Sequence, residues 1–354
     1  MVNLGNTSVT GRSQRWVLTL VTLGLLLVIV MAIAAATGPA QIRAVDVAKM
    51  LIQRLPGVST PQQENWPASH SVIVFRVRLP RIILAAMVGG GLAMAGATYQ
   101  GLLQNPMADP YIIGISAGAS LGAAVGVILR GRFAFFGLST ITLMAFGGAL
   151  LTAFVVYNIA RIGGRVPITT LLLAGVAVSA LLSAVVSFLM VSASQSLHEI
   201  VYWMMGSLSG RGWAHVRASL PYLAIGGLVV LVYARELNIM LLGEETAENL
   251  GVNVELTKVV LLTAGSLMAA AAVSVSGIIG FVGLIIPHTV RLLTGPDHRI
   301  LLPTTALVGA IFLVVADTIA RTILAPAELP VGIITALAGA PFFLYLLRRQ
   351  QGKS

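Results

Sequence analysis

The sequence predicts an all-α polytopic membrane protein with about ten transmembrane helices. Of its 354 residues, 57% are hydrophobic and only 10% are charged, whereas about a quarter of the residues of a soluble protein are charged. Charge-free apolar runs longer than about 18 residues recur along the whole chain, as expected of helices that cross a bilayer. No water-soluble domain fits between these runs, so residues 1–354 are expected to form a single transmembrane domain surrounded by membrane lipid.

Each expected span is an apolar run of about 20 residues. The charge-free runs 166–197 and 259–290 are too long for one straight helix and too short for two. Glycines cluster at 277–283, so the second run is predicted to break there, while the first is predicted to be one long helix with an irregular end. The predicted spans are 16–36, 82–104, 111–130, 138–160, 167–191, 213–234, 257–277, 281–295, 301–321 and 330–347.

The segments outside the spans follow from this count. The first apolar run is long and no small-residue cleavage site with a soluble domain follows it, so it is expected to be a retained helix rather than a signal peptide. An even number of spans places both termini on one side, and the basic residues of 1–15 and 348–353 favour the cytoplasm. Residues 37–81 then form an extracytoplasmic link. Within it, the apolar positions between Ile42 and Leu55 predict an amphipathic helix on the outer surface.

The net charge of +10 does not indicate nucleic-acid binding, because the basic residues stand singly between apolar runs. The predicted topology divides them equally between the two sides, so the positive-inside rule does not decide the orientation. Many basic residues on the outer side are better explained by an acidic partner that meets that face.

No motif for catalysis, a metal or a cofactor is found in the sequence. There is no cysteine, no phosphate-binding loop and no pair of histidines at metal-ligand spacing. The chain is therefore not expected to be an enzyme or to hold a metal or cofactor. If it moves a solute against a gradient, the energy must come from another subunit.

Several polar or small residues interrupt the apolar runs. The glycines at 114, 118, 122 and 126 recur every four residues and predict a flat helix face for close packing. Asp317 is expected to pair with Arg321 one turn later; a proton relay is the alternative. Asp109 lies between two prolines and is expected to face water. Pro287 lacks a backbone donor and is predicted to break the span at 281–295.

A short helix is predicted within the cytoplasmic segment 235–256. Glu244 and Glu245 occupy its first turn, where the helix dipole favours negative charge, and Gly251 stands where a helix ends at positive φ. This leaves Ala247 and Leu250 available to a partner. The local pattern alone fits an ordinary loop helix equally well.

Six blocks carry a resemblance to a known family. In this order and spacing they resemble the FecCD family, the membrane permeases of type II ABC importers for iron–siderophore, haem and cobalamin. The resemblance extends from about Val77 to Arg348. The blocks are Leu79–Arg81, Asn105–Ala119, Tyr202–Leu208, the segment at 243–252, the stretch at 280–299, and Glu328–Phe343.

The resemblance implies an assembly in the bacterial cytoplasmic (inner) membrane. Each subunit would have ten helices, with helices 2–5 and 7–10 forming an inverted repeat. Two copies of this chain, or this chain and a sister permease, would form a twofold dimer. Two separate ATPase subunits would bind on the cytoplasmic side, and a soluble substrate-binding protein would dock outside.

The resemblance also assigns roles to residues of this chain. It implies a coupling helix, which enters a groove of the ATPase, at Glu244, Glu245, Ala247, Glu248, Leu250 and Gly251. It implies docking arginines, which face glutamates of the binding protein, at Arg78, Arg81 and Arg321. It implies a cytoplasmic gate built from Asn105, Pro106, Met107, Pro167, Ile168 and Thr169.

The resulting hypothesis is the permease subunit of an ABC importer, which passes an iron–siderophore complex, haem or cobalamin across the membrane by alternating access. An ion-driven secondary transporter is the alternative, and it predicts broken helices with polar groups at the bilayer midplane. No ionisable cluster of that kind is seen in the spans. A scaffold protein of the membrane is a third possibility, in which changes at Glu245 or Gly251 would leave transport unaffected.

Overall fold

The computed structural model describes residues 9–38, 40, 42–53, 66–129 and 138–351, and these residues form helices and no extended strand. A π-helix, η1 (Ile73–Arg78), and a 3-10 helix, η2 (Ser194–Ser196), are the two irregular helices among them. The α-helices are α1 (Val9–Ala36), α2 (Ala44–Gln53), α3 (Ala68–Val72), α4 (Leu79–Leu102), α5 (Ile115–Ile128), α6 (Thr140–Ala160), α7 (Ile168–Ser192), α8 (Leu197–Met204), α9 (Trp213–Val232), α10 (Ala234–Met240), α11 (Glu244–Asn249), α12 (Val254–Ser276), α13 (Val282–Thr294), α14 (His298–Ala320) and α15 (Val331–Gln351).

Each predicted span overlaps one of these helices, which confirms an all-α polytopic membrane protein. Six helices of the described chain are long and apolar enough to cross a membrane: α1, α6, α7, α9, α12 and α14. Three more, α5, α13 and α15, are apolar but contain a shorter apolar stretch. The remaining predicted span is α4. Within the predicted tail 1–15, residues 1–8 lie outside the described residues, and α1 already begins at Val9.

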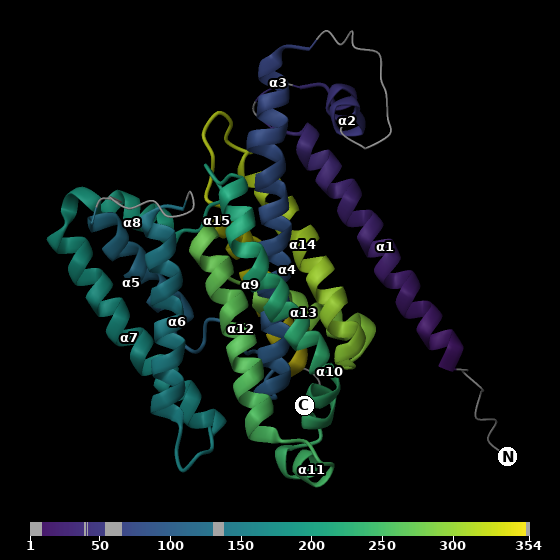
Figure 1. Cartoon of the computed structure of the whole chain (residues 1–354), viewed down its shortest axis with the longest axis vertical. Coiled ribbons are helices and arrows are strands. Elements are labelled where there is room, and N and C mark those ends of the chain that lie inside the picture. Colours follow the sequence, from purple (N-terminus) through teal and green to yellow (C-terminus); the bar gives the residue numbers. More distant parts are fainter. Residues whose placement is uncertain (1–8, 39, 41, 54–65, 130–137, 352–354) are drawn as a thin grey trace.

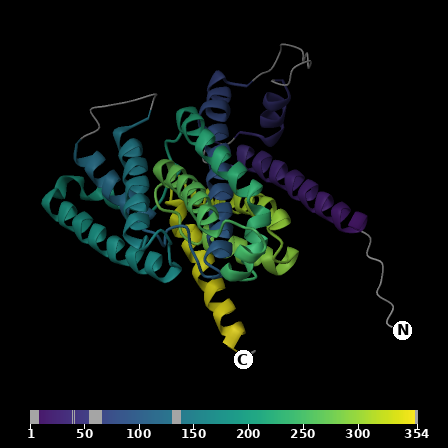
Figure 2. The same ribbon diagram turned by 60° about the horizontal axis from the view of Figure 1, so that its bottom comes forward.

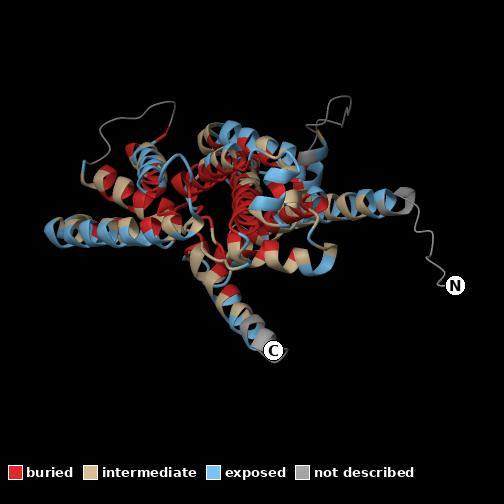
Figure 3. Cartoon of the chain, turned by 90° about the horizontal axis from the view of Figure 1, so that it is seen from below, coloured by how far each residue is buried: buried red, intermediate tan, exposed pale blue. Residues whose placement is uncertain are grey.

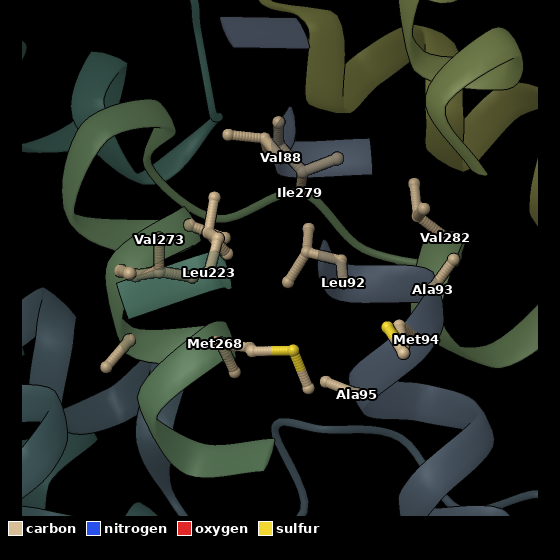
Figure 4. Close-up of a cluster of buried hydrophobic side chains, with 14 of the residues drawn as sticks. Val88, Leu92, Ala93, Met94, Ala95, Leu223, Met268, Val273, Ile279 and Val282 are labelled. Carbon is tan, nitrogen blue, oxygen red and sulfur yellow. The ribbon is translucent and has the colours of Figure 1, made fainter. Parts of the chain in front are cut away.

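Helix α4 is the centre of the molecule (Figure 1). Nearly all its residues from Leu84 to Leu102 are buried, and it packs against α9, α12, α13 and α14. Figure 4 shows Leu92 of α4 between side chains of α9, α12 and α13, such as Leu223, Met268 and Val282. A helix that is apolar on all sides must be covered by other helices, and this explains its place.

Small residues allow a close helix contact in this core. A Cβ atom added to Gly89 of α4 would lie 2.3 Å from the carbonyl oxygen of Gly309 in α14. The two backbones therefore touch directly, as at small-residue crossings of membrane helices. This contact holds α14 against α4.

The predicted glycine face of α5 is confirmed for Gly118, Gly122 and Gly126, whereas Gly114 precedes the helix at a φ of 83°. Cβ atoms added to Gly118 and Gly122 would lie 2.4 Å and 2.0 Å from the carbonyl oxygens of Gly148 and Met144 in α6. Helices α5 and α6 thus form the tightest pair of a second group of helices, α5 to α8, on the left of Figure 1.

Replacing Gly122 with alanine is expected to lower the free energy of unfolding by about 1–3 kcal/mol, because the added methyl group overlaps the backbone of α6. Gly147 on the exposed side of α6 is the matched control, since nothing lies within 4 Å of a Cβ added there. Gly147→Ala is expected to be neutral or to stabilise by up to about 1 kcal/mol. Unfolding midpoints in detergent test both variants, and equal midpoints would contradict the packing argument.

The two long charge-free runs behave as predicted. Helix α7 runs unbroken to Ser192 and is followed by η2, while the second run is interrupted between Ser276 and Val282. The prediction for Pro287 is wrong, because α13 continues through it to Thr294. Pro287 lies in the second turn of a short helix, where the loss of one hydrogen bond to Gly283 does not end the helix.

The link at 37–81 is shorter than predicted. Residues 39, 41 and 54–65 lie outside the described residues, and from Ala68 the chain is helical through α3, η1 and α4. Arginines 76, 78 and 81 interrupt the apolar pattern but not the helix, since arginine is a good helix former. The predicted amphipathic helix is present as α2, with Val47 and Met50 buried against the protein and Val45 and Ile52 exposed.

The molecule has two distinct ends (Figures 1 and 2). Helix α11, the start of α1 and the end of α15 lie at one end, called the α11 end, and α2 and α3 lie at the opposite end, called the α2 end. Helix α1 leans away from the bundle toward its N-terminus, packs mainly on α14, and is exposed along most of its length (Figure 3). The inverted repeat stays a prediction; the two short helices α5 and α13 both begin after a residue with positive φ, Gly114 and Phe281.

Candidate functional site

Helix α11 projects at the α11 end and is bounded by two glycines. Gly243 has a φ of 100° and Gly251 a φ of 83°, values that favour glycine. Glu245, Glu248 and Leu250 are exposed, whereas Ala247 is fully buried within this chain. The prediction that Ala247 is available to a partner is therefore wrong. The exposed residues of this segment are two acids, two neutral polar residues and one leucine: Glu245, Thr246, Glu248, Asn249 and Leu250.

A buried lysine holds α11 in place. Lys258 is 3% exposed, and its Nζ donates to Glu244 at 2.7 Å and to Glu255 at 3.2 Å. Glu255 in turn accepts a hydrogen bond of 3.1 Å from the backbone N–H of Val166, and Nζ also donates to the carbonyl of Val166 at 3.5 Å. Helix α11, the start of α12 and the loop between α6 and α7 are thereby joined.

Helix α10, which precedes α11, is joined to two further elements. Asn238 donates to Asp297 at 2.8 Å and accepts from the backbone N–H of His298 at 2.8 Å. Gln104, which follows α4, donates through Nε2 to the carbonyl of Met240 at 2.5 Å. These bonds connect the segment that carries α11 with α14 and with the loop that contains Asn105–Met107.

Two of the predicted docking arginines bind the end of α1. Arg78 donates through Nη1 to the carbonyls of Ala35 and Ala36 at 2.8 Å and 3.2 Å. Arg321 donates through Nη2 to the carbonyl of Ala34. The last carbonyls of a helix have no partner within it and carry partial negative charge. The two guanidinium groups therefore satisfy and anchor the C-terminus of α1.

The third arginine is the centre of an ion-pair cluster. Arg81 binds Asp317 of α14 through Nε and Nη2, at 3.1 Å and 2.9 Å, and Glu328 through Nη1 at 2.8 Å. Partial burial works to raise the pKa of Glu328, but the charge of Arg81 and hydrogen bonds outweigh it, so the pKa lies below its usual range. The side chain of Asp317 makes no ion pair with Arg321, so the predicted pair is wrong. Asp317 pairs instead with Arg81 on another helix, α4.

These contacts bury the three predicted docking arginines. Arg78, Arg81 and Arg321 are 4%, 6% and 2% exposed. The expectation that their guanidinium groups face outward toward a partner's glutamates is wrong for the chain in this conformation, because the chain supplies the acceptors itself. Their role in docking stays a prediction.

Each of the two predicted gate segments makes its own local structure. The segment Asn105–Met107 forms a turn in which Asn105 Oδ1 accepts from the N–H of Met107 at 2.9 Å. A recess of about 10 Å³ separates Pro106 and Met107 from His288. Pro167 caps α7, with Ile168 and Thr169 in its first turn. Among the described residues no hydrogen bond joins the two segments.

Asp109 is half-buried, so the expectation that it faces water is wrong. Its Oδ1 accepts from the N–H of Tyr111 at 2.8 Å, yet burial raises its pKa to about 6 from an ordinary value of 3.8. The folded state thus prefers the neutral acid, and stability is lost as the pH rises through this interval.

Replacing Asp109 with asparagine keeps the acceptor of the turn and removes the charge. At pH 7 the variant is expected to be more stable by about 1–2 kcal/mol, with allowance for solvent screening. Below about pH 4 the two proteins are expected to unfold at the same temperature. A difference that does not change between pH 4 and pH 7 would show that the charge of Asp109 costs no stability.

Two functional residues were missed in the sequence. Lys258 carried a signal, since it lies near the start of an apolar helix, three residues after Glu255. Glu328 carried none, because its partner Arg81 is 247 residues away.

Comparisons with known proteins bear on this arrangement. The FecCD transport family matches residues 25–349. The chain is 52% identical over 293 residues, 83% of this chain and 78% of the relative, to the cobalamin import system permease protein BtuC of Halobacterium salinarum. It is 43% identical over 283 residues, 79% of this chain and 84% of the relative, to the hemin transport system permease protein HmuU of Yersinia pestis. It also superposes with a TM-score of 0.78 and 34% identity on a solved inward-facing ABC transporter provisionally assigned to the metal-chelate type, over 93% of this chain and 98% of that one.

Proposed function

The chain belongs to the FecCD transport family, and from that premise we propose that it carries a metal chelate through the membrane by alternating access between two copies. The chain is a non-catalytic permease subunit of a type II ABC importer for iron chelates, haem or cobalamin, whose ATPase is a separate subunit.

Helix α11 is proposed as the contact with the ATPase. The observation that carries this is an exposed, rigidly anchored short helix at one end of a membrane protein, with Leu250 and two acids outward and Lys258 beneath. ATP binding would move α11, and the bonds from α10 to α14 and to Gln104 would pass the motion to the gate. Coupling of this kind requires a contiguous set of packed elements.

The α2 end is proposed as the surface for the soluble binding protein. Arg78, Arg81 and Arg321 would act there in one of two ways: by exchanging an internal acceptor for a glutamate of the partner, or by holding the end of α1 and the loop around Glu328 in the docking shape. Charge pairs at such a surface chiefly set register and association rate.

The gate is proposed to be completed by the second copy. Among the described residues of one chain, no hydrogen bond joins the segments Asn105–Met107 and Pro167–Thr169, so a ring built from both is expected to need two chains related by symmetry. A homodimer is proposed, with a sister permease as the alternative partner.

The cargo is proposed to be a ferric siderophore, with cobalamin and haem as the competitors to compare first, given the relatives that carry those names. The test is the ATPase activity of the assembled transporter in nanodiscs, with its binding protein loaded in turn with each compound. Stimulation by one loaded form would identify the cargo. If no ATPase associates and uptake in vesicles follows an ion gradient, the ion-driven alternative holds and the proposal fails.

A further inference from the structure

A crevice lies between α6, α9 and α12 near the α2 end of the bundle. Its volume is about 640 Å³, within the roughly 300–1,000 Å³ of sites that bind small molecules. Leu143 and Phe146 of α6, Tyr222 of α9 and Val275 of α12 are among the residues that line it. The ring centroids of Phe146 and Tyr222 lie 4.9 Å apart, and aromatic and aliphatic carbon makes up most of the lining.

Among the described residues, one charged side chain lines the crevice. Arg217, in the second turn of α9, is exposed and donates through Nε to the carbonyl of Trp213 at 3.4 Å. Its two terminal nitrogens have no acceptor among the described residues, and no acidic side chain is among the described residues that line the crevice. By contrast, Arg81 at the same end is fully paired.

The exposed apolar side chains on the helices beside the crevice indicate that membrane lipid reaches it. Leu220, Ile225 and Leu228 of α9 and Leu151 and Phe154 of α6 are large apolar side chains exposed on the flanking helices. A surface of that composition faces lipid in a membrane protein. Trp213, at the N-terminal end of α9, is an amphipathic side chain of the kind enriched at the bilayer surface, and its Nε1 donates to the carbonyl of Phe75 in η1. The crevice therefore extends from the headgroup level into the hydrocarbon.

We infer that the crevice between α6, α9 and α12 binds an anionic phospholipid, with an acyl chain between Phe146 and Val275 and the headgroup phosphate at Arg217. An acyl chain matches the apolar walls, and a phosphate matches an unpaired guanidinium, which binds phosphate in a bidentate manner. A zwitterionic lipid fills the same walls but offers the arginine a headgroup without net charge.

The test is native mass spectrometry of the full-length protein, titrated with phosphatidylglycerol or with phosphatidylcholine of the same acyl chains. The wild type is expected to retain phosphatidylglycerol in preference to phosphatidylcholine. Arg217→Gln is expected to reduce phosphatidylglycerol binding about fivefold, the effect of one basic side chain at an anionic lipid surface. Phosphatidylcholine binding is expected to fall by a smaller factor, because the choline cation offsets the charge of its phosphate. Arg217→Lys is expected to keep most of the preference.

Two further variants and one competitor separate the parts of the site. Arg76→Gln removes another exposed arginine at the same end and is expected to change nothing. Ala218→Leu narrows the crevice and is expected to reduce binding of both lipids. Soluble glycerol phosphate, which has the headgroup but no chain, is not expected to displace the lipid.

Three results would overturn the inference. The first is equal phosphatidylglycerol binding by the wild type and Arg217→Gln. The second is an equal loss in Arg76→Gln, which would indicate nonspecific surface charge. The third is displacement by glycerol phosphate, which would indicate a phosphate site without an acyl chain. Because Arg217 is exposed, its substitution is not expected to impair folding. Lipid binding by the wild type and Arg217→Gln can therefore be compared even if Ala218→Leu does not fold.

Discussion

Replacing Arg81 with methionine is expected to lower the free energy of unfolding by about 3–5 kcal/mol, because it removes one partner of a buried ion pair. Asp317 would remain buried, with a side chain only 2% exposed, and would lose both nitrogens that bind it. A buried carboxylate without a partner bears its full desolvation cost. Unfolding midpoints of the protein in detergent measure the effect.

Two companion variants give this prediction its controls. Glu328→Gln removes the more exposed partner of Arg81, whose side chain is 27% exposed, and is expected to change stability by at most about 1 kcal/mol. The double change Arg81→Met with Asp317→Leu removes both buried charges and is expected to recover much of the loss. If Arg81→Met and Glu328→Gln were equally stable, the buried pair of Arg81 and Asp317 would contribute no more stability than the more exposed pair of Arg81 and Glu328.

Replacing Leu250 with alanine is expected to weaken binding of the ATPase by up to about 30-fold, with a matching loss of transport. Leu250 is 59% exposed at the end of α11, the place where a partner's groove would receive an apolar side chain. Because it makes little contact within this chain, its truncation is expected to leave the unfolding temperature unchanged. Pull-down of the ATPase and uptake in vesicles measure the two effects.

Leu293 provides the matched control for this change. It is an exposed leucine near the end of α13, outside α11, and is 81% exposed. Leu293→Ala is expected to bind the ATPase as the wild type does. A similar loss in both variants would mean that general surface hydrophobicity, rather than α11, carries the contact, and unchanged binding in both would exclude α11 as the coupling helix.

Features that depend on local pattern were predictable from the sequence. The ten spans, the interruption between Ser276 and Val282, and the irregular end of α7 follow from apolar length and the positions of glycine. The glycine face of α5 also follows, because a four-residue period on a helix fixes one side of it whatever the neighbour is. The short helix α11 follows from its acidic first turn and the glycine after it.

Features that depend on distant partners were not predictable. Arg78 and Arg321 appeared as free outer charges, yet each lies against the end of α1, and Arg78 is 43 residues away from the carbonyl it binds. Asp317 was expected to pair with a neighbour on its own helix, but the bundle places Arg81, 236 residues distant, beside it.

The sequence by itself determined the class of protein, the number of spans and the place of α11, because hydrophobic length, helix period and capping act within a few turns of chain. Only the tertiary structure decided which charges are available. An arginine is drawn to whichever acceptor the packed bundle brings within about 3 Å, and that choice rests on the crossing of α4 with α14 and the position of α1. The tertiary structure also placed Arg217 in a mostly apolar crevice, where the described residues offer its terminal nitrogens no acceptor and a bound lipid phosphate can accept from them.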